Sequence, residues 1–286
     1  MVVSVVAALA AGCGLFGVDL GVEGVEVRSV GIDNHSGRSV LLVEPSGRTP
    51  SDDPLPLVVV LHGLGEDAEA MARLATWPEA ARDVGFVAVF PQGVDDSWNA
   101  GRCCGKASQE GVDDVAFLDA VIAQMVAEEN VDREAVYMTG FSNGAMMTYL
   151  YSCRRPGALV GAASVAGTNF SDCVPSSPSM FMQVSGSDDP IVPVLGGPSE
   201  APGLPEVPSV EASILAVAAA SGCSGRPGGD SDAAVTTFVG EGCAAGDPVR
   251  YDVVRGLGHV YPNLVNSPDY VAVDHIIDFW GMAAGS

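Results

Sequence analysis

The chain has 286 residues, of which 48% are hydrophobic and 17% are charged, so it holds enough apolar side chains for a sizeable core and is not an intrinsically disordered chain. Its 36 acidic residues outnumber its 13 basic residues, which gives a formal net charge of −23. A surface this negative repels phosphate backbones and anionic lipid headgroups, which argues against nucleic-acid binding and against membrane docking through a basic patch.

The first 12 residues contain an apolar run that is too short to span a bilayer, since a transmembrane helix needs about 20 residues. The run is typical of the hydrophobic part of a secretory signal, although no Lys or Arg precedes it. Its end resembles a bacterial lipobox, with Ala10 where Leu is usual, and would place the lipid on Cys13. We expect a signal at residues 1–12, a tether at 13–24 and export to the cell envelope or medium. The alternative is an apolar N-terminal strand or tail.

From residue 25 onward, strand-like and helix-like segments alternate. An antiparallel pair is expected first, at residues 25–32 and 39–43. Apolar runs typical of buried parallel strands follow at 57–61, 86–90, 135–139, 160–166 and 180–185, with a last strand at 249–254. Helices are expected from Asp113 or Asp114, from Asn143 to Arg155, from Ser209 and from Ser267-Pro268, and loops at 194–208 and 222–232. The alternation predicts an α/β domain over 25–286 with a mostly parallel sheet.

Ser142 is the centre of the sequence Gly140-Phe141-Ser142-Asn143-Gly144, which matches the pattern G-x-S-x-G. The pattern follows a predicted strand and opens a predicted helix. This is the context of a nucleophile elbow, in which small residues allow a sharp turn that lifts the serine hydroxyl above the sheet. We therefore expect Ser142 to be a nucleophile; the alternative is a Gly/Ser turn without chemistry.

A serine hydroxyl needs a base, and the chain has four histidines. His35 falls in the early hairpin turn, His275 on the polar side of the last helix, and His62 ahead of the nucleophile in chain order. His259 follows the last strand and satisfies the order serine, acid, histidine of α/β-hydrolases. The expected base is therefore His259.

The acid is expected after the strand 180–185, where Asp188 and Asp189 are adjacent. Either aspartate could orient the imidazole, so their chemistry alone does not distinguish them. Backbone N–H groups are expected to hold the oxyanion, one from Asn143 and one from Leu64 in the loop after the strand 57–61.

The loop of Leu64 has a second interpretation. Residues 63–68 also match the weak dinucleotide-binding pattern G-x-G-x-x-A, with Asp83 nearly 20 residues further on. We discount it because it leaves Ser142 without a role.

Six cysteines follow Cys13, and an even number in an exported chain suggests disulfides. No C-x-x-C pair and no Cys/His ligand spacing is present, so no zinc site is expected. We favour two bonds that each close a loop of about 20 residues, Cys153–Cys173 and Cys223–Cys243. The adjacent Cys103 and Cys104 either bond to each other or leave one thiol free.

Around the candidate catalytic residues and the first cysteine pair, the chain resembles the poly(3-hydroxybutyrate) depolymerase and feruloyl-esterase-like family of secreted α/β-hydrolases, which includes actinobacterial lipoproteins. The similar stretches are residues 57–65, 90–93, 97–99, 103–105, 112–118, 137–147, 186–193 and 258–262. The resemblance implies an α/β-hydrolase fold with helices on both faces of the sheet. It favours Asp189 over Asp188, because the family places the acid directly before a stretch that ends in Val-Pro. The chain departs from the family at Ser185-Gly186, where His-Gly is usual, which weakens the inference of the substrate more than that of the triad.

The expected function is that of a secreted or lipid-anchored serine esterase, acting through an acyl-enzyme without a cofactor or metal. The resemblance implies a hydroxyalkanoate polyester or oligomer, or a feruloyl or other aryl ester, as substrate. Trp98 is expected to line the substrate site, with a buried tryptophan as the alternative. The alternative function is a non-catalytic, surface-anchored binding protein on a hydrolase scaffold. The expected partner is the ester substrate. No nucleic-acid partner is expected, and the chain is expected to be a monomer.

Overall fold

A computed structural model describes residues 18–35, 37–49, 52–176, 180–231, 234–244, 246 and 248–282. The expected signal at 1–12, the lipidation candidate Cys13 and the first part of the tether lie outside these residues. Among the helices described, none has the length and apolar character that crossing a membrane requires.

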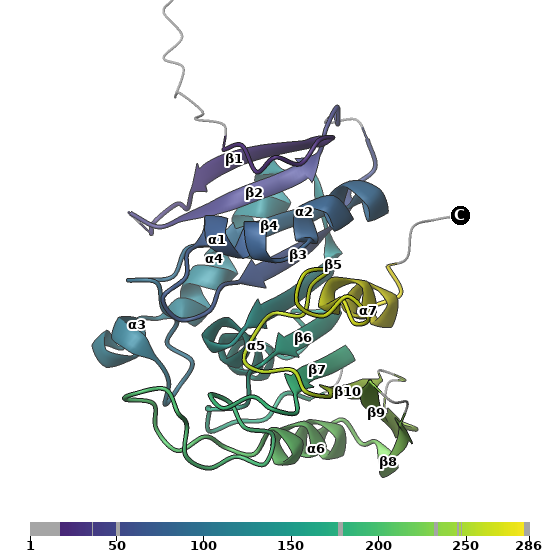
Figure 1. Ribbon diagram of the computed structural model, residues 1–286. Coiled ribbons are helices and arrows are strands. Elements are labelled where there is room, and N and C mark those ends of the chain that lie inside the picture. The colour runs from purple at the N-terminus through teal and green to yellow at the C-terminus, as the bar shows by residue number, and fades with distance from the viewer. Residues whose placement is uncertain are drawn as a thin grey trace, which may run out of the picture.

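Within this part of the chain, ten strands form one sheet in the order β1-β2-β4-β3-β5-β6-β7-β10-β9-β8 (Figure 1). The parallel part consists of β3 (Leu55–Leu61), β4 (Val87–Pro91), β5 (Val131–Phe141), β6 (Gly161–Val165), β7 (Met180–Gly186) and β10 (Val249–Val254). Antiparallel strands complete the two edges, namely β1 (Val25–Gly31) with β2 (Ser39–Pro45), and β9 (Val235–Glu241) with β8 (Ser224–Ser231). The fold prediction of a mostly parallel sheet is confirmed.

Helices cover both faces of the sheet (Figure 1). Each face has its own apolar cluster. One face packs against α4 (Asp114–Glu128), α5 (Asn143–Arg154) and α6 (Val210–Ala220). The other packs against α1 (Ala68–Leu74), α2 (Trp77–Ala80), the π-helical turn η1 (Ala81–Gly85) and α7 (Ala272–Phe279). The short α3 (Gly105–Glu110) precedes α4. Side chains of the central strand β3 alternate between the clusters, with Leu57 and Val59 on the first and Val58 and Val60 on the second, because successive residues of a strand point to opposite faces.

The expectation of a loop at 222–232 is wrong, because β8 covers Ser224–Ser231 and pairs with β9, a strand that the sequence did not indicate. The segment contains Pro227 and two adjacent glycines and has no alternating apolar pattern. It forms a strand at the sheet edge, where pairing is needed on one side only and where proline is tolerated.

The last helix begins at Ala272 and not at Ser267-Pro268. The N–H of Tyr270 closes a turn onto the carbonyl of Ser267, and its hydroxyl donates to buried Asp252 of β10 at 2.7 Å. These bonds tie the segment to the sheet before the helix begins. His275, which the sequence places on the polar side of this helix, is half-buried and stacks on Tyr270 with ring centroids 4.0 Å apart.

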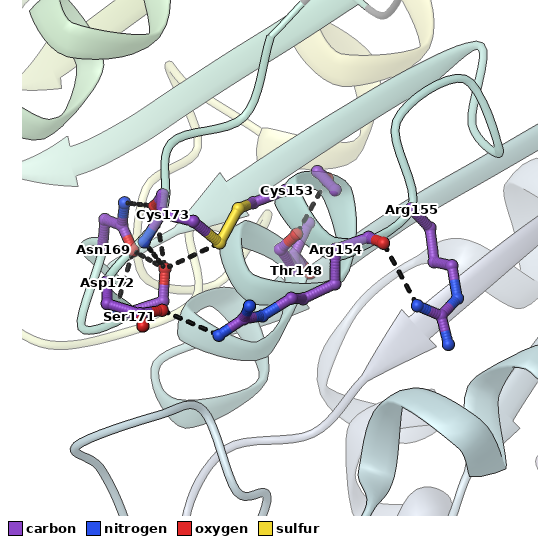
Figure 2. The surroundings of a disulfide bond; sticks show 9 residues. Thr148, Cys153, Arg154, Arg155, Asn169, Ser171, Asp172 and Cys173 are labelled. Carbon is purple, nitrogen blue, oxygen red and sulfur yellow. Dashed lines mark hydrogen bonds and ion pairs between the residues drawn. A yellow bond between two sulfur atoms is a disulfide. The ribbon is translucent and has the colours of Figure 1, made fainter.

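The described cysteines form three disulfides, Cys103–Cys104, Cys153–Cys173 and Cys223–Cys243. The last two are the favoured pairs, and the first resolves the open alternative. Figure 2 shows Cys153, near the end of α5, joined to Cys173 in the loop after β6. Beside this bond Arg154 forms an ion pair with Asp172 at 2.7 Å, and the side chain of Asn169 donates to the carbonyl of Cys173 at 2.7 Å. The loop after β6 is therefore tied to the helix that follows Ser142.

Candidate active site

Ser142 occupies a sharp turn between β5 and α5, with φ 51° and ψ −114°. This is a backbone conformation that non-glycine residues rarely adopt, and the N–H of Ser142 holds it by donating to the carbonyl of Val165 at 2.9 Å. Two glycines allow the turn. A Cβ at Gly140 would lie 2.4 Å from the carbonyl carbon of Gly144, and a Cβ at Gly144 would lie 2.4 Å from the carbonyl oxygen of Leu61. The close approach of β3, β5 and α5 therefore requires glycine at both positions.

The structure brings Ser142, His259 and Asp189 into one hydrogen-bonded row. His259 Nε2 lies 2.9 Å from Ser142 Oγ, and His259 Nδ1 lies 2.8 Å from Asp189 Oδ2. The three residues follow β5, β7 and β10, and the carboxyl ends of parallel strands meet at one edge of a sheet. Asp189 is 4% exposed, and its other oxygen accepts the N–H groups of Ile191 and Val192 at 2.8 Å each. Its carboxylate is thus held from two sides.

The two candidate acids have different surroundings. Asp188 is exposed, and its carboxylate accepts a hydrogen bond from the hydroxyl of Ser187 at 2.7 Å. Of the two carboxylates, only that of Asp189 contacts the imidazole of His259. The loop of His259 is anchored two residues further on, where the hydroxyl of Tyr261 accepts the indole N–H of buried Trp77 at 3.0 Å.

The two main-chain N–H groups expected to hold an oxyanion lie on neighbouring segments. Asn143 opens α5, and Leu64 is in the turn after β3; neither N–H donates to an acceptor within the described part of the chain. The segments are in contact, because a Cβ at Gly144 would lie 2.5 Å from the carbonyl oxygen of His62. The N-terminus of a helix and a free turn amide are suitable donors to a developing negative charge.

His62 is fully buried beside this turn and supports it. Its Nε2 accepts the N–H of Gly93 at 2.9 Å, so its Nδ1 carries the proton and donates to the carbonyl of Gly63 at 2.8 Å. Burial lowers the pKa of His62, which keeps the ring neutral, as this arrangement requires. Chain order set His62 aside as a candidate base, and both of its ring nitrogens are bonded to main-chain groups, but no feature of the sequence showed that it holds the turn of Leu64.

Trp98 does not line the substrate site, and this expectation is corrected. Its side chain is fully buried, and its indole N–H donates to the carbonyl of His62 at 3.0 Å. Its main chain makes two bonds with the side chain of Asn143: the N–H of Trp98 donates to Oδ1 at 2.7 Å, and Nδ2 donates to the carbonyl of Trp98 at 3.1 Å. The sequence pattern indicated a role only for the main-chain N–H of Asn143 and gave no signal for its side chain.

A buried ion pair supports the segment around Trp98. Arg38 of the loop before β2 forms an ion pair with Asp114 at 2.7 Å, and the other oxygen of Asp114 accepts the N–H of Asn99 at 2.8 Å. Burial raises the pKa of Asp114, and the charge of Arg38 opposes this shift. Arg38 also donates to the carbonyl of Gln92 at 3.1 Å. The segment from Gln92 to Asn99 is therefore held at both of its ends by the ion pair.

No group of three or more His, Cys, Asp or Glu side chains among the described residues has a geometry suited to a metal ion. The fold, a turn of the elbow type and a Ser-His-Asp row at the carboxyl edge of the sheet together define an α/β-hydrolase. The chain belongs to the family described as esterase PHB depolymerase, whose model matches residues 39–249. The resemblance stated from the sequence is thereby confirmed.

Individual proteins are similar to the chain at moderate identity. NocK of Nocardia uniformis subsp. tsuyamanensis, assigned as an esterase, is 30% identical over 231 residues, which cover 72% of this chain and 65% of NocK. Feruloyl esterase C of Emericella nidulans is 29% identical over 173 residues, which cover 58% of this chain and 60% of that protein. The chain thus spans less than two thirds of the length of these curated relatives. Among solved structures, an acetyl xylan esterase from Aspergillus awamori matches 90% of this chain and 100% of its own with a TM-score of 0.63; at 14% identity this shows the fold alone.

Proposed function

We propose that the protein is a serine esterase in which Ser142 is the nucleophile, His259 the general base and acid, and Asp189 the residue that orients His259. The observation that carries the proposal is the row of contacts at 2.9 Å and 2.8 Å that joins the three side chains. A serine hydroxyl at neutral pH becomes a useful nucleophile only when a positioned base accepts its proton, and this row supplies that base.

The proposed reaction uses this geometry. Ser142 Oγ attacks the ester carbonyl while its proton passes to His259 Nε2, and the N–H groups of Asn143 and Leu64 stabilise the negative oxygen. When the tetrahedral intermediate collapses, the bond to the alkoxy oxygen breaks and His259 protonates the leaving alcohol. A water molecule then gives a proton to His259 and attacks the acyl carbonyl. When this second tetrahedral intermediate collapses, the bond to Ser142 Oγ breaks, His259 returns the proton to Ser142 Oγ and the acid is released. Asp189 stabilises the imidazolium that forms in each step.

The substrate class is inferred from relatives and from apolar side chains at the site. The matched relatives include a feruloyl esterase, and the family that matches the chain is described as esterase PHB depolymerase. Leu64 in the turn of the proposed oxyanion donors is 45% exposed, and Val260 beside His259 is 36% exposed. Exposed apolar side chains at these two positions suit an ester with an apolar acyl group. Hydroxyalkanoate oligomers and feruloyl or other aryl esters are the two classes to compare in a substrate panel.

The test of the esterase is hydrolysis of p-nitrophenyl butyrate by the parent protein and by Ser142→Ala. We expect the variant to lose activity by at least about 10³-fold, and a sulfonyl fluoride to label Ser142 in the parent protein. Ser29→Ala is the matched control, because Ser29 is exposed on the edge strand β1. Equal rates for the parent and Ser142→Ala would overturn the proposal.

Export to the cell envelope or medium is also part of the proposal. Disulfides persist in oxidising compartments, and the described residues contain three of them. The apolar run before Cys13 supports a lipid anchor at that residue. We expect Cys13→Ser to move the protein from the membrane fraction to the soluble fraction; unchanged partitioning would argue against the anchor.

A further inference from the structure

The two proposed oxyanion donors come from segments far apart in sequence, the turn after β3 and the first residue of α5. Hydrogen bonding to an oxyanion needs donors placed within a few tenths of an ångström, so something must fix these segments relative to each other. Trp98, in the loop after β4, makes hydrogen bonds to both.

The first connection is to Asn143. The side-chain amide of Asn143 and the main chain of Trp98 form a pair of bonds in opposite directions, 2.7 Å and 3.1 Å long, and both residues are almost completely buried. The residue whose side chain is held in this way also carries the donor N–H. Fixing its amide group from outside the helix therefore fixes the first turn of α5.

The second connection is to Leu64. The indole N–H of Trp98 donates to the carbonyl of His62 at 3.0 Å, and the two rings lie 4.9 Å apart. His62 in turn holds the carbonyl of Gly63 at 2.8 Å. That carbonyl and the N–H of Leu64 belong to one planar peptide group, so the direction of the N–H follows from the position of His62.

Trp98 is itself firmly held. Its carbonyl also accepts the N–H of Cys104 at 3.2 Å, and the next residue, Asn99, donates to Asp114, whose charge is paired with Arg38. The indole is fully buried, so it has no surface to offer a substrate.

We propose that Trp98 is a positioning residue that sets the geometry of the oxyanion hole by holding the segments of Leu64 and Asn143 at a fixed separation. The inference rests on the proposed serine esterase function. Trp98 acts without touching the substrate, so its removal weakens the stabilisation of the transition state more than it weakens substrate binding.

Trp98→Phe keeps an aromatic ring in the core and deletes the indole N–H. The assay compares a phenyl ester with the matching thionoester, in which sulfur replaces the carbonyl oxygen. Sulfur accepts hydrogen bonds poorly, so the thionoester gains little from the donors. We expect kcat for the ester to fall about 10- to 100-fold with KM little changed, and kcat for the thionoester to fall less than about threefold.

Asn143→Ala tests the other connection and covers the case in which Trp98→Phe does not fold. It retains the main-chain N–H of Asn143 and removes both bonds to the main chain of Trp98. We expect the same selective loss of ester turnover.

Trp77→Phe is the matched control, since Trp77 is also fully buried and donates one indole hydrogen bond of 3.0 Å, to Tyr261 in the loop of His259. Any loss there should affect ester and thionoester equally. An unchanged ratio of ester to thionoester turnover in both Trp98→Phe and Asn143→Ala would overturn the positioning role. Failure of the esterase proposal is a separate result, because it is seen in the parent protein and Ser142→Ala before these variants are compared.

Discussion

The substitution Asp189→Asn tests the proposed row with a change of a single atom. Asp189 Oδ1 accepts the N–H groups of Ile191 and Val192, and Oδ2 faces His259 Nδ1. In the variant the amide oxygen stays with the two N–H donors, because the reverse orientation would oppose NH₂ to them and lose both bonds. The amide NH₂ then faces His259 and donates to Nδ1.

This reversal moves the proton of the neutral imidazole to Nε2, which lies 2.9 Å from Ser142 Oγ. The ring can then no longer accept the serine proton. In a serine protease the corresponding change of tautomer lowers kcat by about 10⁴-fold, which is about 5.4 kcal/mol of transition-state stabilisation. The variant side chain still makes three hydrogen bonds, to Ile191, Val192 and His259, so we expect the folded structure and KM to change little.

The assay is steady-state hydrolysis of p-nitrophenyl acetate, with circular dichroism to verify the fold. Asp188→Asn is the control, because it makes the same change of charge at the adjacent, exposed residue, and we expect its kcat to stay within about twofold of the parent. A kcat for Asp189→Asn within tenfold of the parent, or an equal loss for Asp188→Asn, would refute the assignment of the acid.

Three further predictions concern stability, each measured by urea unfolding. Burial lowers the pKa of His62 from 6.5, so below pH 6.5 the unfolded state binds a proton that the folded state excludes. The free energy of unfolding therefore falls as the pH drops below 6.5, by up to about 1.4 kcal/mol per pH unit. His62→Asn should reduce the difference in this free energy between pH 5.5 and pH 7.5, and an undiminished difference would contradict this. Gly144→Ala should destabilise the fold by about 3 kcal/mol or more because its Cβ would lie 2.4 Å from a carbonyl oxygen of β3, whereas Gly31→Ala, with open space around it, should cost less than about 1 kcal/mol; similar costs would be contrary to the geometry. Replacing Cys153 and Cys173 together by serine opens a loop with a sequence separation of 20 and should cost about 3 kcal/mol, and a loss below about 1 kcal/mol would exclude this entropic account.

The features that the sequence predicted well depend on local patterns. The continuous apolar run of β3 indicates a strand buried on both faces, and the change from strand to helix around Ser142 identifies the turn between them. Chain order reduced four histidines to His259 as the candidate base, because the order of elements in this fold constrains which loop can supply one. The choice of Asp189 over Asp188 needed the family resemblance, since two adjacent carboxylates have the same chemistry before the fold buries one of them.

The features that the sequence missed depend on contacts between distant segments. The strand β8 exists because β9 offers it a free edge, and the start of α7 is set by the bond from Tyr270 to Asp252 on β10. Trp98 illustrates the same limit, because a tryptophan in a loop is equally compatible with a substrate surface and with a core. Its burial follows from contacts with His62 and Asn143, which are 36 and 45 residues away.

The spacing of the row along the chain has a consequence for how the proposed esterase activity would be regained after denaturation. Ser142 and His259 are separated by 117 residues, and His259 and Asp189 by 70. Long loops must close before such contacts form, and β10 must join the sheet before His259 reaches its place. During renaturation we therefore expect far-UV circular dichroism to recover ahead of ester turnover, so that enzymatic activity reports the last stage of assembly of the native state.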